Sequence, residues 1–282
     1  MSGRDGTAAR QRLDTGLLLR AYAAGLFPMA DTRDSADVFW VEPRRRGILP
    51  LMEFHLPRSL ARTLKRERFF HSRDLAFDAV VQSCASTAPG REQSWINATI
   101  HDAYLRLHAQ GHAHSIETWD MDGRLVGGLY GVRVGAAFFG ESMFSRATDA
   151  SKAALAHLIA RLRLGGFALL DTQFLTAHLE RFGGREVRRS DYVERLAAAV
   201  SRPARWTLLD ALEGFPPQPS GGGVVAGGAA GVSAAGFAVS GLPPPDFAAP
   251  EFRAPDFALP PELLGALGPS GKRIVQLLSQ TS

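Results

Sequence analysis

Two short polar segments contain the residues best suited to chemistry, and each lies at the end of a strand-like run. The first is Gly140 to Arg146, which holds the carboxylate Glu141 ahead of a helical pattern. The second is Asp171-Thr172-Gln173, which follows a buried apolar run. Asp171 and Gln173 are two residues apart and therefore share one face of a strand. Together they would place a carboxylate and an amide side by side, beside the carboxylate of the first segment.

Each segment also has a purely structural interpretation. Glu141 can form an ion pair with Arg146 or Lys152, and the polar side chains of 171–173 can satisfy the first N–H groups of a following helix. A buried carboxylate is costly unless it is paired or used. Because two strand ends of one sheet both carry polar side chains, each strengthens the functional interpretation of the other. We interpret the two segments together as a candidate site.

Other chemical motifs are weak. His112-x-His114 can chelate a metal, but no third ligand with zinc-like spacing is near, so the sequence predicts no metal site. The single cysteine, Cys84, excludes a disulfide framework and is expected to be packed and inert. The sequence contains no nucleophile elbow, Walker loop or dinucleotide fingerprint, and we expect no cofactor.

The elements that position these residues follow a β-β-β-α-β-α order. Three strand-like runs joined by turn signals predict an antiparallel meander, and an amphipathic helix that ends at Gly165-Gly166 follows it. The predicted ranges are strands 113–119, 124–132 and 136–141, helix 149–164, strand 168–174, helix 176–182, strand 186–189 and helix 190–200. This order predicts one mixed α/β domain.

The regions before and after this pattern differ from it. Helical spacing predicts helices at 13–26, 58–67, 72–86 and 97–110, with Ser72 and Asn97 as N-caps. The composition changes near Gly214 to runs of Gly and Pro, which predicts a flexible tail, although 272–278 is apolar enough to dock as a short helix or strand. We therefore expect three parts: a mostly helical part (1–95), a catalytic α/β domain (96–213) and a disordered tail (214–282).

The charge pattern is compatible with nucleic acid. Lys and Arg total 32 against 28 Asp and Glu, a net charge of +4. Basic residues gather at 44–46, 58–68 and 185–189, and such clusters can bind phosphates. Scattered solvated charges are the alternative for each cluster. No run approaches the roughly 20 apolar residues of a membrane helix, and with a single cysteine this predicts a soluble cytoplasmic protein.

Six segments in order resemble one known family. They are Ala21-Tyr22-Ala23-Ala24-Gly25-Leu26-Phe27-Pro28, Gly111-His112-Ala113-His114-Ser115-Ile116-Glu117, Leu125-Val126-Gly127-Gly128-Leu129-Tyr130-Gly131, Gly140 to Arg146, Ala150-Ser151-Lys152 and Asp171-Thr172-Gln173. Together they resemble the leucyl/phenylalanyl-tRNA–protein transferase family over about residues 13–206. The resemblance implies a fold like that of the acetyl-CoA-dependent N-acetyltransferases (GNAT) in the catalytic part.

The implied activity is transfer of Leu or Phe, with some Met, from aminoacyl-tRNA to the N-terminal Arg or Lys of a protein, which marks that protein for the N-degron pathway. The implied catalytic residues are Asp171, Gln173 and Glu141, and the implied substrate-binding residues are Trp95, Phe138, Met143, Phe144 and Ser145. We expect RNA contacts from Trp40, Arg44, Arg45, Arg62, Lys65 and Arg66. Many relatives carry a second tryptophan where this chain has Val41, so one aromatic contact is expected to be missing.

Two rival functions remain at this point. An acyl-CoA N-acyltransferase should carry a Gly-rich pyrophosphate loop before the long helix, but residues 145–150 contain no glycine. A non-catalytic RNA-binding adaptor would not need the polar cluster at Glu141, Asp171 and Gln173. Proximity of Glu141 and Gln173 is the structural requirement of the transferase hypothesis.

Overall fold

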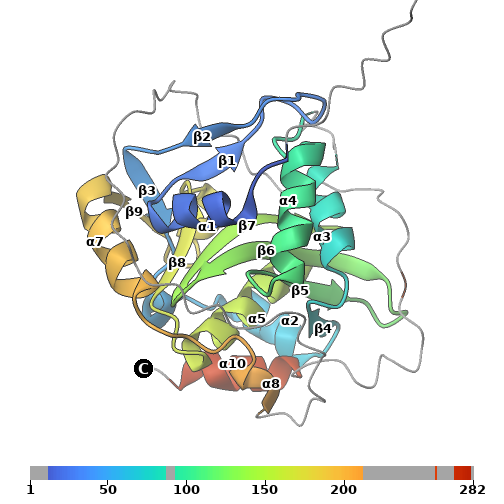
Figure 1. Cartoon of the computed structure of the whole chain (residues 1–282). Coiled ribbons are helices and arrows are strands. Elements are labelled where there is room, and N and C mark those ends of the chain that lie inside the picture. Colours follow the sequence, from blue (N-terminus) through green and yellow to red (C-terminus); the bar gives the residue numbers. More distant parts are fainter. Residues whose placement is uncertain (1–11, 87–92, 212–257, 259–269, 281–282) are drawn as a thin grey trace, which may run out of the picture.

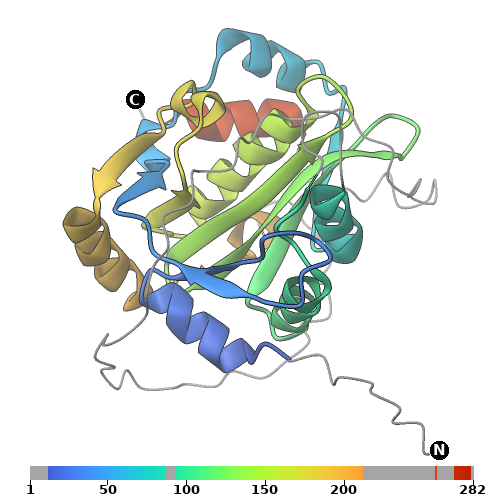
Figure 2. The same cartoon turned by 90° about the horizontal axis from the view of Figure 1, so that it is seen from above.

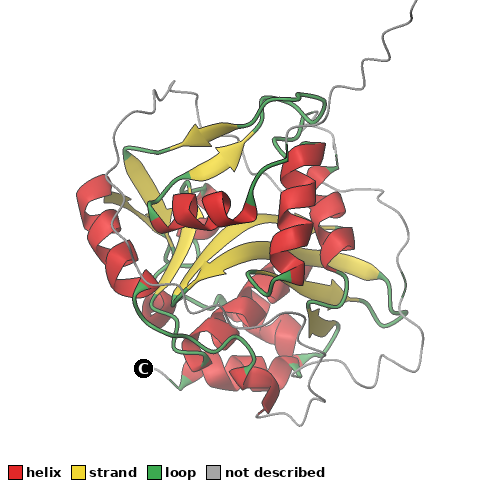
Figure 3. Cartoon of the chain, viewed as in Figure 1, coloured by secondary structure: helices red, strands yellow, loops and turns green. Residues whose placement is uncertain are grey.

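The computed structural model describes residues 12–86, 93–211, 258 and 270–280. Figure 3 shows how helices and strands alternate along this part of the chain. The strands are β1 (Phe27–Met29), β2 (Phe39–Val41), β3 (Arg45–Ile48), β4 (Phe70–Arg73), β5 (Ala113–Trp119), β6 (Leu125–Val134), β7 (Ala137–Ser145), β8 (Leu169–Gln173) and β9 (Arg185–Arg188). The helices are α1 (Thr15–Ala23), the short 3-10 helix η1 (Leu51–Glu53), α2 (Arg58–Lys65), α3 (Phe77–Ala85), α4 (Ala98–Ala109), α5 (Ala150–Leu164), α6 (Ala177–Glu180), α7 (Arg189–Val200), α8 (Leu208–Ala211) and α10 (Gly271–Ser279).

A seven-stranded sheet forms the centre of the fold (Figure 1). Its order is β4-β5-β6-β7-β8-β3-β9, and its neighbours pair antiparallel except β7 with β8, which are parallel. A parallel pair needs a crossover connection, and α5 supplies it. β1 and β2 form a separate two-stranded ribbon. The predicted mixed α/β fold is thereby confirmed, whereas its GNAT-like character stays a prediction.

The sheet separates two apolar cores (Figures 1 and 2). Helices α1, α3, α4 and α7 pack on one face, where Leu18 and Ile100 are fully buried. Helices α2, α5, α8 and α10 pack on the other, where Ile159 and Ile274 are fully buried. Glycines let α5 lie close to the sheet, because a Cβ on Gly127 would be 2.7 Å from the Cβ of Ala150.

The second half of the chain follows the sequence-based expectation closely. The predicted meander is formed by β5, β6 and β7, and α5 and β8 follow it in the predicted order. One boundary was wrong: β7 continues to Ser145 instead of ending at Glu141. The segment from Gly140 to Ser145 is therefore strand rather than a loop before α5, and its residues 142–145 pair with residues 127–130 of β6.

The first half contains strands that its pattern did not predict. The helix predicted to start at Ser72 begins at Phe77 instead, and Ser72 lies in β4, where its hydroxyl donates to Glu117. Asp74 ends β4 with a left-handed φ of 58°. Asn97 is the N-cap of α4, as predicted. Strands β3 and β4 come from the first predicted part, yet they belong to the same seven-stranded sheet as the strands of the second part. A domain boundary between residues 95 and 96 stays a prediction.

The predicted flexible tail lies largely outside the described residues. Within the described stretch 270–280, the apolar segment docks as helix α10, one of the two forms predicted for it. The helices of the described ranges include none with the length and apolar character needed to cross a membrane.

Candidate active site

The candidate site lies where β7 and β8 separate. The two strands pair in parallel only as far as Phe139 and Asp171. Immediately beyond this point each strand has a β-bulge. Glu141 has no pairing partner between β6 and β7, and Thr172 has none between β3 and β8. Bulges of this kind bend a strand and re-aim its side chains, and they are common beside active sites. Here they bring Glu141 and Gln173 together.

Gln173 ends β8 in a strained turn. Its φ of 56° lies in the left-handed region, which costs a non-glycine residue about 1–3 kcal/mol. The N–H of Phe174 donates to the carbonyl of Thr172 over 2.6 Å, and this closes a three-residue turn around Gln173. Oδ1 of Asp171 accepts the Gln173 N–H at 2.7 Å and holds the turn. Gly47 of β3 leaves room for it, since a Cβ there would lie 2.6 Å from the carbonyl carbon of Phe174.

Glu141 is buried and surrounded by neutral donors. The hydroxyl of Tyr104 donates to its Oε2 over 2.9 Å, and Nε2 of Gln173 donates to its Oε1 over 3.2 Å. A second tyrosine, Tyr22, shares a 2.8 Å hydrogen bond with Tyr104. Burial raises the pKa of Glu141 to about 7, although the tyrosine hydrogen bonds oppose the shift. The carboxyl group therefore titrates near neutral pH.

The ion pairs proposed as an alternative for Glu141 are contradicted. Lys152 pairs with Asp149 at 2.7 Å. The guanidinium of Arg146 donates to Ser83 and to the carbonyl of residue 125, on other elements. Glu141 is thus engaged by an amide and a hydroxyl instead of a cation.

Asp171, in contrast, has a strong cationic partner. It is fully buried, and its carboxylate accepts hydrogen bonds from Nε of Arg46 at 3.0 Å and from Nη2 at 2.7 Å. The hydroxyl of Tyr192 donates to Oδ2 over 2.6 Å. Burial and the nearby Asp171 carboxylate raise the pKa of Tyr192, which keeps its hydroxyl protonated as a donor. Arg46 also donates to the carbonyl of Gly25 over 3.0 Å, so this pair ties α1, β3, β8 and α7 together.

A pocket opens beside Glu141 and Gln173 and contains about 620 Å³ of empty space, part of which is open solvent. Its walls are largely apolar, with a few polar groups that converge at the β7–β8 split. The apolar lining residues are Leu129, Met143, Leu155, Leu158, Leu170, Phe174 and Leu179. The polar side chains in the lining are Tyr130, Glu141, Ser142, Thr172, Gln173, Thr176 and His178. Its lining suits a ligand that joins an apolar side chain to a polar group.

The structure brings together three of the predicted site residues, Glu141, Gln173 and Met143, around this pocket. Asp171 lies behind Gln173 and outside the lining, where it contacts the Gln173 backbone. The remaining predicted substrate-binding residues lie outside the lining and their role stays a prediction. Phe138 is buried on the α5 face and Phe144 on the opposite face, Ser145 accepts the N–H of residue 151 at the start of α5, and Trp95 is half-buried against the core.

The predicted RNA-binding residues form two groups. They are an α2 group of Arg62, Lys65 and Arg66 and a β2–β3 group of Trp40, Arg44 and Arg45. The α2 group is exposed and forms no ion pair with any described residue. In the β2–β3 group, Arg45 pairs with Glu186 at 2.8 Å and Trp40 is half-buried against the core. RNA binding by either group stays a prediction.

Sequence reasoning missed the partners of the two carboxylates. It placed Arg46 in a basic surface cluster, yet this side chain is 1% exposed and pairs with Asp171. The sequence carries no signal that separates it from its exposed neighbour Arg45, because β3 is buried continuously from Arg46 to Ile48 and only its pairing with β8 explains the difference. Tyr104 and Tyr192 lie on apolar helix faces, where the pattern indicates only core packing.

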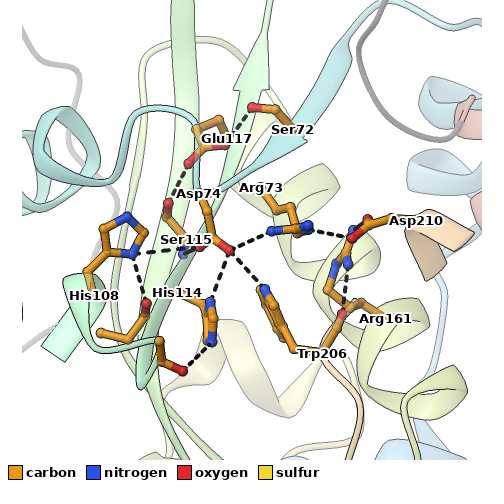
Figure 4. Close-up of polar contacts among 12 residues, drawn as sticks. Ser72, Arg73, Asp74, His108, His114, Ser115, Glu117, Arg161, Trp206 and Asp210 are labelled. Carbon is orange, nitrogen blue, oxygen red and sulfur yellow. Dashed lines mark hydrogen bonds and ion pairs between the residues drawn. The ribbon is translucent and has the colours of Figure 1, made fainter. Parts of the chain in front are cut away.

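A second buried polar cluster surrounds Asp74, next to the β4 edge of the sheet (Figure 4). Its carboxylate accepts from Arg73 and His114, each at 3.0 Å, from the indole of Trp206 at 2.9 Å and from the N–H of Ser115 at 3.0 Å. Burial raises the pKa of Asp74, but His114 and the hydrogen bonds outweigh it and hold the pKa well below its usual range. Figure 4 shows the donors converging on this carboxylate.

His112 and His114 were considered as metal ligands on sequence grounds. In the structure Nδ1 of His114 contacts Asp74, and its ring stacks on Trp206 with centroids 4.4 Å apart. Over the described ranges, no three His, Cys, Asp or Glu side chains are grouped so that they could hold a metal ion.

A mixed α/β sheet split beside an apolar pocket, with an amide and a titratable carboxyl at the split, defines an α/β protein with a candidate ligand-binding site. Comparisons with known proteins specify this class further. The model of the leucyl/phenylalanyl-tRNA protein transferase family matches residues 48–197, and the model of the N-terminal domain of the same family matches residues 11–44. The chain belongs to this family.

Individual relatives agree with the family match, and each of the following is called a leucyl/phenylalanyl-tRNA–protein transferase. A protein of Rhizorhabdus wittichii is 60% identical over 188 residues, which cover 67% of this chain and 75% of the relative. A protein of Zymomonas mobilis is 53% identical over 206 residues, 71% of this chain and 76% of the relative. One from Paramagnetospirillum magneticum is 56% identical over 192 residues, 68% and 91% of the two chains.

Proposed function

We propose that this protein is an aminoacyltransferase that moves Leu or Phe, and some Met, from aminoacyl-tRNA to the N-terminal Arg or Lys of acceptor proteins in the bacterial cytoplasm. Family membership supports the reaction type. The observation that carries the site assignment is the contact of Gln173 with Glu141 at the polar end of an apolar pocket. The product would enter the N-degron pathway.

The pocket supports the choice of amino acid. Leu155, Leu158 and Met143 present flexible apolar surface, which suits a large side chain that is unbranched at Cβ. In this proposal Val and Ile are poor substrates, because their branched Cβ adds bulk directly beside the reacting carbonyl group. One methylene changes transfer by about 1–3 kcal/mol in such a pocket, so Met is accepted at a lower rate.

The chemistry requires positioning more than activation. The aminoacyl ester is already activated, so no covalent nucleophile or ATP is needed. The nitrogen of the acceptor α-amine forms the new bond to the ester carbonyl carbon, the bond from that carbon to the ribose oxygen breaks, and the proton lost by the amine goes to the ribose oxygen. Because Nε2 of Gln173 donates to Glu141, its Oε1 is the end that accepts an N–H of the attacking amine.

Asp171 supports this arrangement from behind. Its oxygens are occupied by Arg46, Tyr192 and the Gln173 backbone. We therefore assign Asp171 as a positioning residue that holds the strained Gln173 turn. Glu141 orients the Gln173 amide and, when ionised, attracts the cationic group of a substrate.

For the tRNA, the α2 group offers the more accessible phosphate contacts. Arg62, Lys65 and Arg66 are exposed and unpaired among the described residues, whereas Arg45 is already paired with Glu186. Salt-sensitive binding with little sequence reading is expected from such contacts.

The test is single-turnover aminoacylation of an Arg-starting peptide with labelled Phe-tRNA. We expect Gln173→Ala to lower the rate of transfer by about 10²–10³-fold, because removal of one preorganised hydrogen-bonding group at a reacting centre has an effect of this size. Gln110→Ala, at the exposed end of α4, is the matched control and should keep the wild-type rate. A wild-type rate in Gln173→Ala would remove Gln173 from the mechanism, and an inactive wild-type protein would overturn the function itself.

A further inference from the structure

The C-terminal helix α10 is packed into the fold on one of the predicted RNA-binding elements. Ile274, Val275 and Leu278 are buried in the core on the α5 face, together with Leu60 and Leu64 of α2. Figures 1 and 2 both show α10 lying beside α2 and α5. α10 lies outside both segments matched by the family, so family membership does not assign it a role.

The contact between α10 and α2 is close enough to fix their relative position. A Cβ on Gly271 would lie 2.1 Å from the carbonyl oxygen of Leu64, so the two backbones meet at the first residue of α10 and the last turn of α2. At the other end, Nη1 of Arg163 on α5 donates to the carbonyl of Leu278 over 3.2 Å. The start of α10 is therefore held against the C-terminal turn of α2.

This junction concentrates positive charge. Residues 58–68 contain five basic side chains and one acidic side chain, Glu67, and α10 adds Lys272 and Arg273 without any acid. Nζ of Lys272 pairs with Glu67 at 3.0 Å. The two α10 cations occupy the first turn of the helix, where the dipole disfavours positive charge. Helix stability therefore does not explain their presence.

We propose that α10 completes a composite basic surface with α2 and that this surface binds the phosphate backbone of tRNA. Its members are Arg58, Arg62, Lys65, Arg66, Arg68, Lys272 and Arg273, all of them exposed. Lys272 neutralises Glu67, which is the one acidic residue of the 58–68 segment, and Arg273 extends the basic surface beyond α2. The identity of the RNA rests on the function proposed above, whereas the surface and its polyanionic partner follow from the α2–α10 junction.

The experiment measures the affinity of the full-length protein for deacylated tRNA between about 50 and 200 mM salt. In Lys272→Ala/Arg273→Ala we expect a Kd several-fold higher at low salt and a salt dependence weaker by about one to two counterions. The KM for Phe-tRNA should rise with the Kd, while kcat stays unchanged. The control is Arg195→Ala/Arg202→Ala, which removes two exposed arginines on and just beyond α7, an element well separated from α2 in both views.

A second variant acts in the opposite direction. Glu67→Gln removes the single acid of the α2 segment and frees Lys272, so it should tighten tRNA binding about two- to threefold at low salt. A wild-type Kd and salt dependence in Lys272→Ala/Arg273→Ala would overturn the role of α10. Failure of the proposed function gives a distinct result, namely a wild-type protein that transfers no amino acid to the peptide.

Discussion

The clusters around Asp74 and around Glu141 both bury a carboxyl group beside the same sheet, but they are built for different purposes. Asp74 accepts hydrogen bonds from the guanidinium of Arg73, the imidazole of His114, the indole of Trp206 and the N–H of Ser115, and its pKa is held low. Glu141 has hydroxyl and amide partners, a pKa near 7, a strained neighbour in Gln173 and a pocket beside it. Burial of a carboxyl group therefore does not by itself indicate a functional site. A buried carboxyl group that has no cationic partner and lies beside a pocket is the more informative sign.

Asp171 tests this distinction because it lies in the cluster around Glu141 but is paired with a cation, as Asp74 is. Arg46 pairs with it over 2.7 Å in the core. Its contribution to the site passes through the backbone of Gln173. The comparison therefore predicts that Asp74 and Asp171 are alike in stability and unlike in activity.

The largest effect is expected from Asp74→Ala and Asp171→Ala. Asp171→Ala should lower the free energy of unfolding by about 3–5 kcal/mol, because the buried cation Arg46 loses its ion pair. Asp74→Ala should lower it by a similar amount, because His114, Trp206 and the Ser115 N–H all lose their acceptor, although Arg73 keeps its ion pair with Asp210. Peptide aminoacylation per folded molecule should be nearly normal in Asp74→Ala and strongly reduced in Asp171→Ala. Urea unfolding and single-turnover transfer measure the two quantities. Asp74→Asn and Asp171→Asn keep the shape if the alanine variants do not fold, and equal activities in the two variants would break the comparison.

A smaller effect concerns pH. The pKa of Glu141 is about 7 in the folded protein and near its ordinary value when unfolded, so the folded state binds the proton more tightly. Stability should therefore fall as the pH rises from about 5 to 8, by about 2.5 kcal/mol from this group. Glu141→Gln should lose that part of the pH dependence in urea unfolding, while the exposed Glu194→Gln keeps it. An unchanged pH dependence in Glu141→Gln would contradict the assignment.

The smallest effect is expected in the pocket wall. Met143→Ala enlarges the pocket and should shift the ratio of Phe to Leu transfer towards Phe by about fivefold, or about 1 kcal/mol. Competition between Phe-tRNA and Leu-tRNA in one reaction measures this ratio directly. Met121→Ala is the control, because this methionine is 61% exposed. A ratio that is the same in both variants would show that Met143 does not contact the transferred side chain.

The sequence predicted the elements with strong periodicity and the convergence of their polar ends. A strand-like run followed by a turn signal defined β5, and the helical spacing ended by Gly165-Gly166 defined α5. Spacing predicted that Glu141 and Gln173 would meet, and the 3.2 Å contact confirms it. Spacing could not predict the bulge in β7 at Glu141, which turns this side chain towards Gln173. A bulge depends on the register of two paired strands, and one strand's sequence does not show that register.

The partners of the two carboxylates were also out of reach. Arg46 comes from a four-residue strand, and Tyr192 from a helix 21 residues after Asp171. Such contacts depend on long-range pairing, and a single sequence shows an arginine in a basic run or a tyrosine on an apolar face. Knowledge that β3 lies beside β8 is what distinguishes Arg46 from its neighbours.

The packing of α10 against α2 has a consequence for folding during synthesis. Lys272 and Glu67 are 205 residues apart in the chain, yet their side chains form an ion pair that joins α10 to the end of α2. During synthesis α2 leaves the ribosome long before the segment that covers its apolar side. Until translation reaches α10, Leu60 and Leu64 remain without this cover, so the nascent chain passes through a stage in which it is open to chaperones and to aggregation.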